Sequence, residues 1–464
     1  MKFTIITHAA HKIKAKNIFA YEPYVREMNL WLKYVDEVQI VAPISEEKVT
    51  SIESKYQFNK RHSEQGEAIS PNEQITSSQA PRYDKPNRHP QLDWGSHDLK
   101  YKKQIPNRVG NDGIELIPIQ SFDIKSLKNG IIAIFKIPKI LGVIYKAMLW
   151  ADHIHLRCPG NIGLLGCIVQ ILFPNKPKTI KYAGNWDPKS KQPLSYRLQK
   201  WILSNTFLTR NAKVLVYGEW PNQSKNIIPF FTATYSEKEI LERHSTLDAE
   251  SYDEMLKQVQ QDESERHSEQ REAILFKEQI ATSHTPRNGA KVNFLFVGAL
   301  SKGKQPLLSV KVVEQLKNKN YNVQLEIYGD GIERNNIEAY IKENQLQKAI
   351  HLHGNTSKEI VKKAYQKAHF LLFISKSEGW PKVVAEAMFW ACLPITSNVS
   401  CIPYMLGNGT RGTIVNPTIN EIVSVVESYF ANEKKYNVQV KKAMEWSRQY
   451  TLEKFEEEIG KLLK

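Results

Sequence analysis

The sequence predicts an α/β protein made of two doubly wound, Rossmann-like domains that face each other across a central cleft. Short strand-like runs alternate with helical stretches along the chain, and this alternation stops near residue 231 and restarts near residue 292. Strands that alternate with helices form βαβ units, which build parallel sheets. At about 150 residues per domain, a chain of 464 residues has room for two such domains and for insertions.

Each expected strand is a short run rich in β-branched and aromatic residues. In the first half these runs cover residues 2–7, 37–42, 114–119, 153–156, 179–183 and 213–217. In the second half they cover residues 292–297, 324–328, 351–352, 370–374 and 393–396. Parallel sheets bind ligands beyond the carboxyl ends of their strands, so the cleft between the domains is the expected site.

The domain boundaries follow from the same pattern. We expect a first domain over residues 1–232, a linker over residues 233–290 and a second domain over residues 291–440. Residues 441–464 are expected to form a C-terminal helix that packs back on the first domain.

A repeated segment interrupts both halves of the chain. Residues 61–84 and residues 266–289 are identical at 14 of 24 positions, while their flanks show no similarity. Two such copies are typical of a mobile in-frame insertion and not of a duplicated domain. Their composition, rich in Glu, Gln, Ser, Arg and Pro, predicts disordered surface loops. The first copy lies within a larger insertion over about residues 46–110.

The composition excludes several classes of protein. A hydrophobic content of 41% with 24% charged residues is that of a globular chain and excludes wholesale disorder. The four cysteines contain no C-x-x-C pair, which indicates reduced thiols in a cytoplasmic compartment and no zinc site. Residues 1–9 lack the long apolar core of a signal peptide. The most apolar stretch, residues 131–150, contains lysines and a proline, so we expect no transmembrane helix.

Positive charge is concentrated in one window. Residues 124–217 contain fifteen Lys and Arg against two acids, whereas the net charge of the whole chain is +15. Such a run forms either a solvated face or a surface for an anionic partner. Residues 131–150, with Lys136, Lys139 and Lys146 beside apolar residues, suit an amphipathic helix on the inner face of an anionic membrane. Nucleic acid is not expected, because no recognisable nucleic-acid-binding motif is present.

The strongest chemical signal lies in residues 370–394, where an apolar strand is followed by a loop and a helix over residues 382–391. The loop contains Glu378, Gly379, Trp380 and Pro381. A glycine lets a ligand approach the backbone, and the free amides of a helix start bind phosphate. Because Glu386 lies on a largely apolar segment of the helix, its carboxylate needs a polar partner, and a ligand is favoured.

This stretch resembles the E-x7-E signature of family-4 glycosyltransferases, which are retaining enzymes of the GT-B fold. The order of four further motifs is also similar: FLFVGALSKGK (294–304), LEIYGDGIER (325–334), IHLHGN (350–355) and CIPYMLGNGTRGTIVNP (401–417). The likeness covers residues 292–432. It implies a second domain that binds a nucleotide-diphosphate-sugar donor and a first domain that binds the acceptor.

On the donor side, the resemblance implies a role for each matching residue. Glu378 would be catalytic, contacting the donor sugar near the reacting carbon, and Glu386 would bind the ribose hydroxyls. Amides near Lys382 and Val383 would hold the diphosphate, together with Lys304, which matches the family's lysine. The remaining donor-binding candidates are Gly298, Lys302, Gly379, Trp380 and Pro381.

The donor motif departs from the family pattern in one place. Ala299 stands where the family usually has arginine, so Lys302 is the candidate substitute. Residues 298–304 also fit most of the P-loop spacing, but Gln305 stands where a P-loop requires Ser or Thr. The chain contains no D-x-D pattern, and we therefore expect no metal and no cofactor besides the nucleotide-sugar co-substrate.

The first half resembles the family's acceptor domain more loosely, through THAAHK (7–12), YEPYVREMNLW (21–31), DHIHLRCPGNIG (152–163) and YAGNWDP (182–188). His8 and His11 follow a strand end and are candidates to line the cleft. His155 matches a position that the family often fills with histidine near the donor sugar, and it is either catalytic or a core residue. Further acceptor-side candidates are Arg157, Asn185 and Asp187.

The leading hypothesis is a glycosyltransferase that moves a sugar from a nucleotide-diphosphate donor to a glycan or lipid-linked acceptor. Retention at the anomeric carbon and a role in cell-envelope polysaccharide assembly are part of this hypothesis. Two alternatives remain: another GT-B enzyme such as a nucleotide-sugar epimerase, and a non-catalytic protein that binds anionic surfaces through its basic window.

Overall fold

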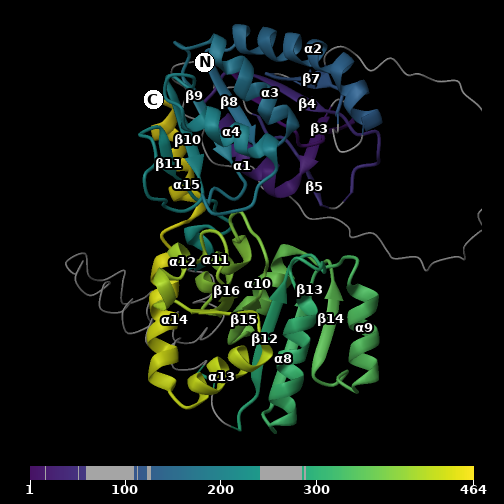
Figure 1. Ribbon diagram of the computed structural model, residues 1–464, viewed down its shortest axis with the longest axis vertical. Coiled ribbons are helices and arrows are strands. Elements are labelled where there is room, and N and C mark those ends of the chain that lie inside the picture. Colours follow the sequence, from purple (N-terminus) through teal and green to yellow (C-terminus); the bar gives the residue numbers. More distant parts are fainter. Residues whose placement is uncertain are drawn as a thin grey trace, which may run out of the picture.

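The computed structural model describes residues 1–15, 17–50, 52–58, 109–111, 113–122, 127–240, 285–286 and 289–464. Side chains are described in all of these ranges except 109–111 and 127–135. Two α/β domains lie one above the other in Figure 1, each with a sheet covered by helices. The repeat at residues 61–84 lies outside the described residues, as does most of the repeat at residues 266–289.

Within the described residues, the first domain is built on an eight-stranded sheet of order β11-β10-β9-β8-β1-β4-β7-β6. Its strands are β1 (Lys2–Ile6), β4 (Glu37–Pro43), β6 (Val109–Asn111), β7 (Ile114–Ile119), β8 (His153–Cys158), β9 (Lys178–Tyr182), β10 (Ala212–Val216) and β11 (Ile227–Pro229). All neighbours are parallel except β6, which runs antiparallel to β7. The chain winds outward from β1 through β4 and β7, then returns to β8 on the other side. The winding therefore reverses between β1 and β8.

The second domain repeats this topology in a six-stranded parallel sheet of order β14-β13-β12-β15-β16-β17. Its strands are β12 (Val292–Val297), β13 (Val323–Tyr328), β14 (Ile350–Gly354), β15 (Phe370–Phe373), β16 (Leu393–Ser397) and β17 (Thr413–Val415). Here the winding reverses between β12 and β15. In open parallel sheets, ligands bind in the crevice at such a reversal. Every strand that the sequence predicted is present, and the predicted α/β class is confirmed.

Helices cover the faces of both sheets (Figure 1). Those of the first domain are α1 (Glu22–Leu32), α2 (Leu127–Trp150), α3 (Asn161–Val169) with the short η1 (Gln170–Leu172), and α4 (Leu194–Ser204). Those that follow are α8 (Pro306–Asn318), α9 (Arg334–Glu343), α10 (Lys358–Lys367), α11 (Lys382–Phe389), α12 (Ile402–Met405), η2 (Gly407–Gly409), α13 (Ile419–Phe430), α14 (Glu433–Ser447) and α15 (Leu452–Leu463). The predicted helices over residues 131–150 and 382–391 correspond to α2 and α11.

A small antiparallel sheet was not predicted from the sequence. It consists of β2 (Lys12–Lys14), β3 (Asn17–Tyr21) and β5 (Glu53–Lys55). Strands of three to five residues are too short to show a recognisable alternation, which explains why the sequence did not predict them. β5 occupies part of the expected insertion over about residues 46–110.

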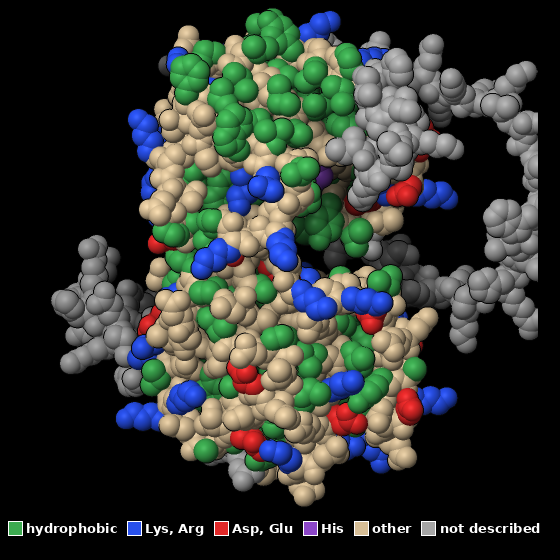
Figure 2. Space-filling view, in the orientation of Figure 1, with side chains coloured by type: hydrophobic (Ala, Val, Ile, Leu, Met, Phe, Trp, Pro, Cys, Tyr) green, Lys and Arg blue, Asp and Glu red, His purple; other side chains and the backbone are tan. Residues whose placement is uncertain are grey.

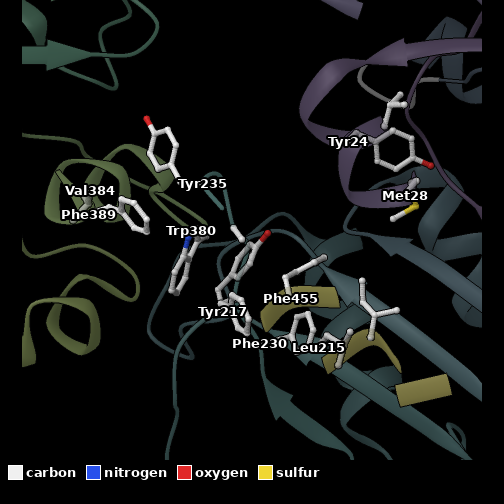
Figure 3. Packing of buried hydrophobic residues seen from close by; sticks show 14 of the residues in the cluster. Tyr24, Met28, Leu215, Tyr217, Phe230, Tyr235, Trp380, Val384, Phe389 and Phe455 are labelled. Carbon is white, nitrogen blue, oxygen red and sulfur yellow. The ribbon is translucent and has the colours of Figure 1, made fainter. Parts of the chain in front are cut away.

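An aromatic cluster joins the two domains, and we call it the aromatic junction (Figure 3). Trp380 of the second domain packs against Tyr217 of the first, with ring centroids 5.4 Å apart and the ring planes tilted by 37°. The last helix, α15, leaves the second domain and packs on the first, where the Phe455 ring lies 5.4 Å from that of Phe230. Tyr34, in the turn that follows α1, donates a hydrogen bond of 3.1 Å to the Glu456 carbonyl. The chain therefore crosses between the domains twice.

Four lysines of the basic window donate to backbone carbonyls of the protein itself, so the prediction that this window forms one exposed face is only partly correct. Lys176 donates to the carbonyls of Met148, Leu149 and Ala151, which end α2. Lys181 is fully buried and donates 2.8 Å to the Phe231 carbonyl. The other two, Lys178 and Lys200, also donate to backbone carbonyls. Buried ammonium groups require such acceptors, and sequence composition does not reveal them.

No helix in the described part of the chain is both long enough and apolar enough to span a membrane.

Replacing Phe455 with alanine is expected to lower the free energy of unfolding by about 3 kcal/mol, because a buried phenyl ring leaves a cavity between α15 and the first domain. Chemical denaturation measures the change. Phe207→Ala is the matched control: its ring is 70% exposed, so its loss should cost less than about 0.5 kcal/mol. Equal effects of the two substitutions would contradict the described packing of α15.

Candidate functional site

The candidate site of the second domain lies where the winding of its sheet reverses. The loop after β12 carries Lys304 and the loop after β15 carries Glu378, and their side chains form an ion pair through Nζ and Oε1. Ser375 donates to the same carboxylate oxygen. The backbone amide of Lys376 donates 2.9 Å to the Gly303 carbonyl, so the two loops are bound together. Glu378 is 9% exposed, and Lys304 remains accessible at 27%.

The loop after β13 packs against the same place. Gly329 has φ +132°, and a Cβ atom there would lie 2.0 Å from the Gly298 carbonyl oxygen. Only glycine permits this approach of two backbones. Asp330 accepts 2.7 Å from the Gly331 amide, which is the turn expected of an Asp-Gly pair. A Cβ atom added to Gly298 would meet no atom within 4 Å, so the backbone is open on that side.

Glu386 already has polar partners within the protein. Thr234, on the segment that crosses between the domains, donates 2.8 Å to Oε1, and Tyr365 on α10 donates 3.1 Å to Oε2. Burial and the carboxylate both raise the pKa of Tyr365, which keeps its hydroxyl protonated. The sequence predicts a ligand as the polar partner of Glu386. In the structure, Thr234 and Tyr365 supply part of that partner. A carboxylate has about four acceptor positions, so positions remain for hydroxyl donors.

The loop between the two glutamates touches the first domain. A Cβ atom on Gly379 would lie 3.1 Å from the Ala183 carbonyl oxygen. Ser400 donates 2.9 Å to the Gly379 carbonyl and lies 3.2 Å from the side-chain oxygen of Asn185. Trp380 is 8% exposed within the aromatic junction, so its ring is not open to a donor. Its ring holds the loop in place instead.

α11 begins directly behind this loop. Pro381 is buried at its N-cap position, and no described side chain caps the first turn. Lys382 and Val383 are half-buried in that turn. Burial lowers the pKa of Lys382, while Glu27 and Glu386 act in the opposite direction. The start of α11 therefore offers backbone amides and one ammonium group to an anion.

Arg157, on the first-domain side of the cleft, is paired with a residue that the sequence did not single out. Its guanidinium binds both carboxylate oxygens of Glu27 on α1, at 2.5 and 3.4 Å. Burial raises the pKa of Glu27, but Arg157, Lys181 and Lys382 lower it by more, so the carboxylate stays charged. One sequence signal was available: Glu27 lies on the same helix face as the buried Tyr24 and Trp31.

A cavity of about 640 Å³ lies at the reversal of the first sheet. His8 follows β1 and Gly160 follows β8, and an added Cβ on Gly160 would come within 2.9 Å of the His8 ring. Burial and Arg157 lower the pKa of His8, which favours the neutral imidazole. The wall combines apolar and polar groups from the loops after β4, β7 and β8 and from the start of α4: Pro43, Ser121, Phe122, Asn161, Ile162, Pro193, Leu194, Ser195 and Tyr196.

Two predicted histidines do not reach the cleft. His155 is fully buried between β1 and β9, where its Nδ1 lies 2.9 Å from the Thr179 hydroxyl and its ring lies 4.6 Å from that of Trp31. His11 is also fully buried, and its two ring nitrogens bind the Ala9 carbonyl and the Tyr56 hydroxyl. The structure therefore places both side chains in the core of the first domain, closed off from the cleft.

The remaining candidates are placed as follows. Asp187 forms a turn in which its carboxylate accepts 2.8 Å from the Lys189 amide and its own amide donates to Asn185. Lys302 is exposed on the loop before α8. Within the described residues, no three His, Cys, Asp or Glu side chains are grouped so that they could hold a metal ion.

Residues 278–446 match the family model described as Glycosyl transferases group 1. A stretch of 180 residues is 23% identical to the phosphatidylinositol N-acetylglucosaminyltransferase GPI3 subunit of Saccharomyces cerevisiae, covering 37% of this chain and 40% of that protein. A stretch of 105 residues is 32% identical to the GalNAc-alpha-(1->4)-GalNAc-alpha-(1->3)-diNAcBac-PP-undecaprenol alpha-1,4-N-acetyl-D-galactosaminyltransferase of Campylobacter jejuni, covering 22% and 28%. The chain therefore spans less than half the length of these curated relatives.

Solved structures share the whole fold. Sucrose-phosphate synthase from Thermosynechococcus elongatus has a TM-score of 0.55 at 15% identity, covering 100% of this chain and 98% of the other. Anabaena HepE in complex with UDP and glucose has a TM-score of 0.54 at 10% identity, covering 100% and 99%. At these identities the likeness shows the fold, which is GT-B.

Acid is expected to destabilise the protein through its buried histidines. Burial lowers the pKa of His11 and His153 to about 4, and it lowers that of His155 well below its ordinary value. The unfolded chain takes up these protons near pH 6.5 and the folded chain does not, so stability falls as the pH drops. Between about pH 7.5 and about pH 5.5, three such groups should together cost about 4 kcal/mol.

Denaturation at the two pH values measures this loss. His153→Gln should reduce the loss by about 1.3 kcal/mol, which is the contribution of one such histidine over this interval. A stability that does not change over this interval would show that the histidines are accessible to protons in the folded protein.

Proposed function

We propose that the whole chain is a glycosyltransferase, because residues 278–446 match the family model of the glycosyl transferases group 1. The second domain binds a nucleotide-diphosphate-sugar donor, and the first binds the acceptor. One observation carries this proposal: the Glu378–Lys304 pair lies at the reversal of one sheet, and the cavity beside His8 lies at the reversal of the other. Reversals of this kind are where parallel sheets bind their ligands.

The candidate site of the second domain has a suitable group for each part of a nucleotide-diphosphate sugar. Lys304 and the first turn of α11, with Lys382, meet the charge of the diphosphate. Glu386, oriented by Thr234 and Tyr365, accepts hydrogen bonds from the ribose hydroxyls. Glu378, fixed by Ser375 and Lys304, faces the sugar. Each carboxylate is held by neighbours, so little reorganisation is needed when the donor binds.

The reaction breaks the bond between the anomeric carbon and the phosphate oxygen and forms one to an acceptor oxygen. For retention, the acceptor attacks the face that the phosphate leaves, and the acceptor proton passes to a phosphate oxygen. Cations and amides at the diphosphate stabilise the charge that develops there. The contribution of the two domains is to hold donor and acceptor in contact, because orientation supplies much of the rate of a two-substrate reaction.

The acceptor is proposed to be a glycan carried on a lipid. The cavity beside His8 combines polar groups, such as Asn161 and Tyr196, with apolar ones, such as Phe122 and Ile162, which suits an amphiphilic molecule. Two relatives support this choice, since their printed names mention phosphatidylinositol and an undecaprenol-linked glycan. A third is described as a protein of the cps region of Klebsiella pneumoniae. We place the enzyme in the cytoplasm, at the inner face of the membrane, in envelope polysaccharide assembly.

Donor binding is expected to raise the melting temperature of the protein, because a ligand present at a hundredfold excess over its Kd stabilises by about 2.7 kcal/mol. A thermal-shift series with UDP, GDP and CDP sugars should show one preferred nucleotide. Glu386→Ala should abolish that shift, whereas Glu343→Ala, an exposed glutamate on α9, should retain it. A full shift in Glu386→Ala would remove Glu386 from the donor site.

Glu378→Gln is expected to reduce kcat by about a hundredfold or more while the protein stays folded, because the charge facing the sugar is lost and the shape is kept. Release of free nucleotide together with mass analysis of the acceptor measures the reaction, and Glu343→Gln is the matched control. Sugar must appear on the acceptor as nucleotide is released. Conversion of the donor sugar without an acceptor would show an epimerase instead.

A further inference from the structure

One face of the first domain exposes an unusual number of large apolar side chains. Among the described residues, eight of the thirteen exposed large hydrophobic side chains belong to α2, α3 with η1, α4 and the loop that follows α4. We call this set the apolar face: Tyr145, Leu149, Ile168, Leu172, Leu194, Leu198, Trp201 and Phe207. Exposed apolar residues are normally scattered singly, and a contiguous set marks an interaction surface.

The spacing of these residues shows that they form stripes. Tyr145 and Leu149 are four residues apart on α2, and Ile168 and Leu172 are four apart on α3 and η1. Residues Leu194, Leu198 and Trp201 repeat the pattern on α4. Side chains three or four positions apart lie on the same side of a helix, so each helix presents one apolar stripe to solvent.

The three stripes are adjacent. α3 packs against both α2 and α4, so it lies between them. Figure 2 shows hydrophobic side chains gathered over the part of the upper domain where Figure 1 places these helices. The exposure is substantial at the centre and ends of the face: Trp201 is 59%, Leu172 66% and Leu194 78% exposed.

The charges around this face indicate the nature of its partner. Six exposed cations lie on the same helices and on the loops that flank them: Lys139, Lys146, Lys189, Lys191, Arg197 and Arg210. Over residues 136–217, all of which the structure describes, the acids are Asp152 and Asp187 alone. A second copy of this chain would bring the same positive charge against itself, which disfavours a dimer through this face. An anionic bilayer offers both an apolar interior and opposite charge.

We propose that the apolar face docks on the surface of an anionic lipid bilayer, with its apolar side chains among the acyl chains and its cations among the headgroups. This proposal rests on the proposed function and deepens it by assigning the membrane contact to three helices. Leu194 belongs to the apolar face and also lines the cavity beside His8. Docking therefore places the acceptor cavity at the bilayer, where a lipid-linked acceptor can reach it without leaving the membrane.

Sedimentation with vesicles tests the proposal on the full chain. The wild-type protein should bind vesicles that contain phosphatidylglycerol and bind much less to phosphatidylcholine alone. Leu198→Ser combined with Trp201→Ser should weaken binding by at least about tenfold, because binding scales with the apolar area inserted. The matched control is Ile332→Ser with Ile360→Ser, which removes exposed apolar residues of the second domain and should change nothing.

A charge variant separates the contribution of the cations to membrane binding from that of the apolar side chains. Lys189→Glu with Lys191→Glu should weaken binding to anionic vesicles and leave the weak binding to neutral vesicles unchanged. Equal binding of wild type and the Leu198→Ser, Trp201→Ser variant would overturn the proposal. A wild-type dimer in sedimentation velocity that becomes a monomer in this variant would also overturn it, by showing that a second copy covers the face.

The outcome is independent of the proposed catalysis. Vesicle binding needs neither donor nor acceptor, and the donor-induced thermal shift needs no vesicle. The Leu198→Ser, Trp201→Ser variant should keep the full donor shift, which also shows that it is folded. If no nucleotide sugar raises the melting temperature of the wild type, the proposed function is contradicted. Vesicle binding would still test the docking proposal separately.

Discussion

The packing of the aromatic junction and of α15 between the domains is the contact on which the site depends. Each sheet reverses its winding at its own crevice, so each domain carries one of the two crevices. Trp380 against Tyr217 and Phe455 against Phe230 hold the domains together, and the close approach of Gly379 to Ala183 brings the loop after β15 to the first domain. Because the chain crosses between the domains twice, near residue 231 and again before α15, the two crevices are tied to each other at both crossings.

Buried charge is the second organising constraint. Arg157 pairs with Glu27 at the cleft, and Lys181 donates to the Phe231 carbonyl, while the charge of Lys382 helps to lower the pKa of Glu27. Such groups are costly to bury, and the hydrogen bonds between them offset that cost. Lys176 has a different role. It donates to carbonyls in the last turn of α2, which have no partner within the helix. Once the lysines that bind backbone carbonyls are set aside, the remaining exposed cations gather beside the apolar stripes of α2, α3 and α4.

The candidate site was predictable where its residues lie in one continuous motif. Glu378, Gly379 and Glu386 were found in the segment after β15, and the structure places all three around one loop and helix start. Lys304 lies 74 positions earlier, and its pairing with Glu378 arises because β12 and β15 are neighbours in the sheet. The roles of Trp380, His11 and His155 were not predictable, because each depends on the residues that pack on it: Tyr217, Tyr56 and Trp31 come from distant parts of the chain.

The sequence by itself determined the alternation of strands and helices, the restart that separates two domains, and the segment that carries Glu378 and Glu386. These features are local, because the side-chain periodicity and the turn residues that determine them lie within a few positions of each other. Only the tertiary structure decided which polar residues are open to a ligand, that Glu27 pairs with Arg157, and that three helices align their apolar stripes on one surface. Burial and pairing are properties of contacts between segments far apart in the chain, and no single segment specifies its own neighbours.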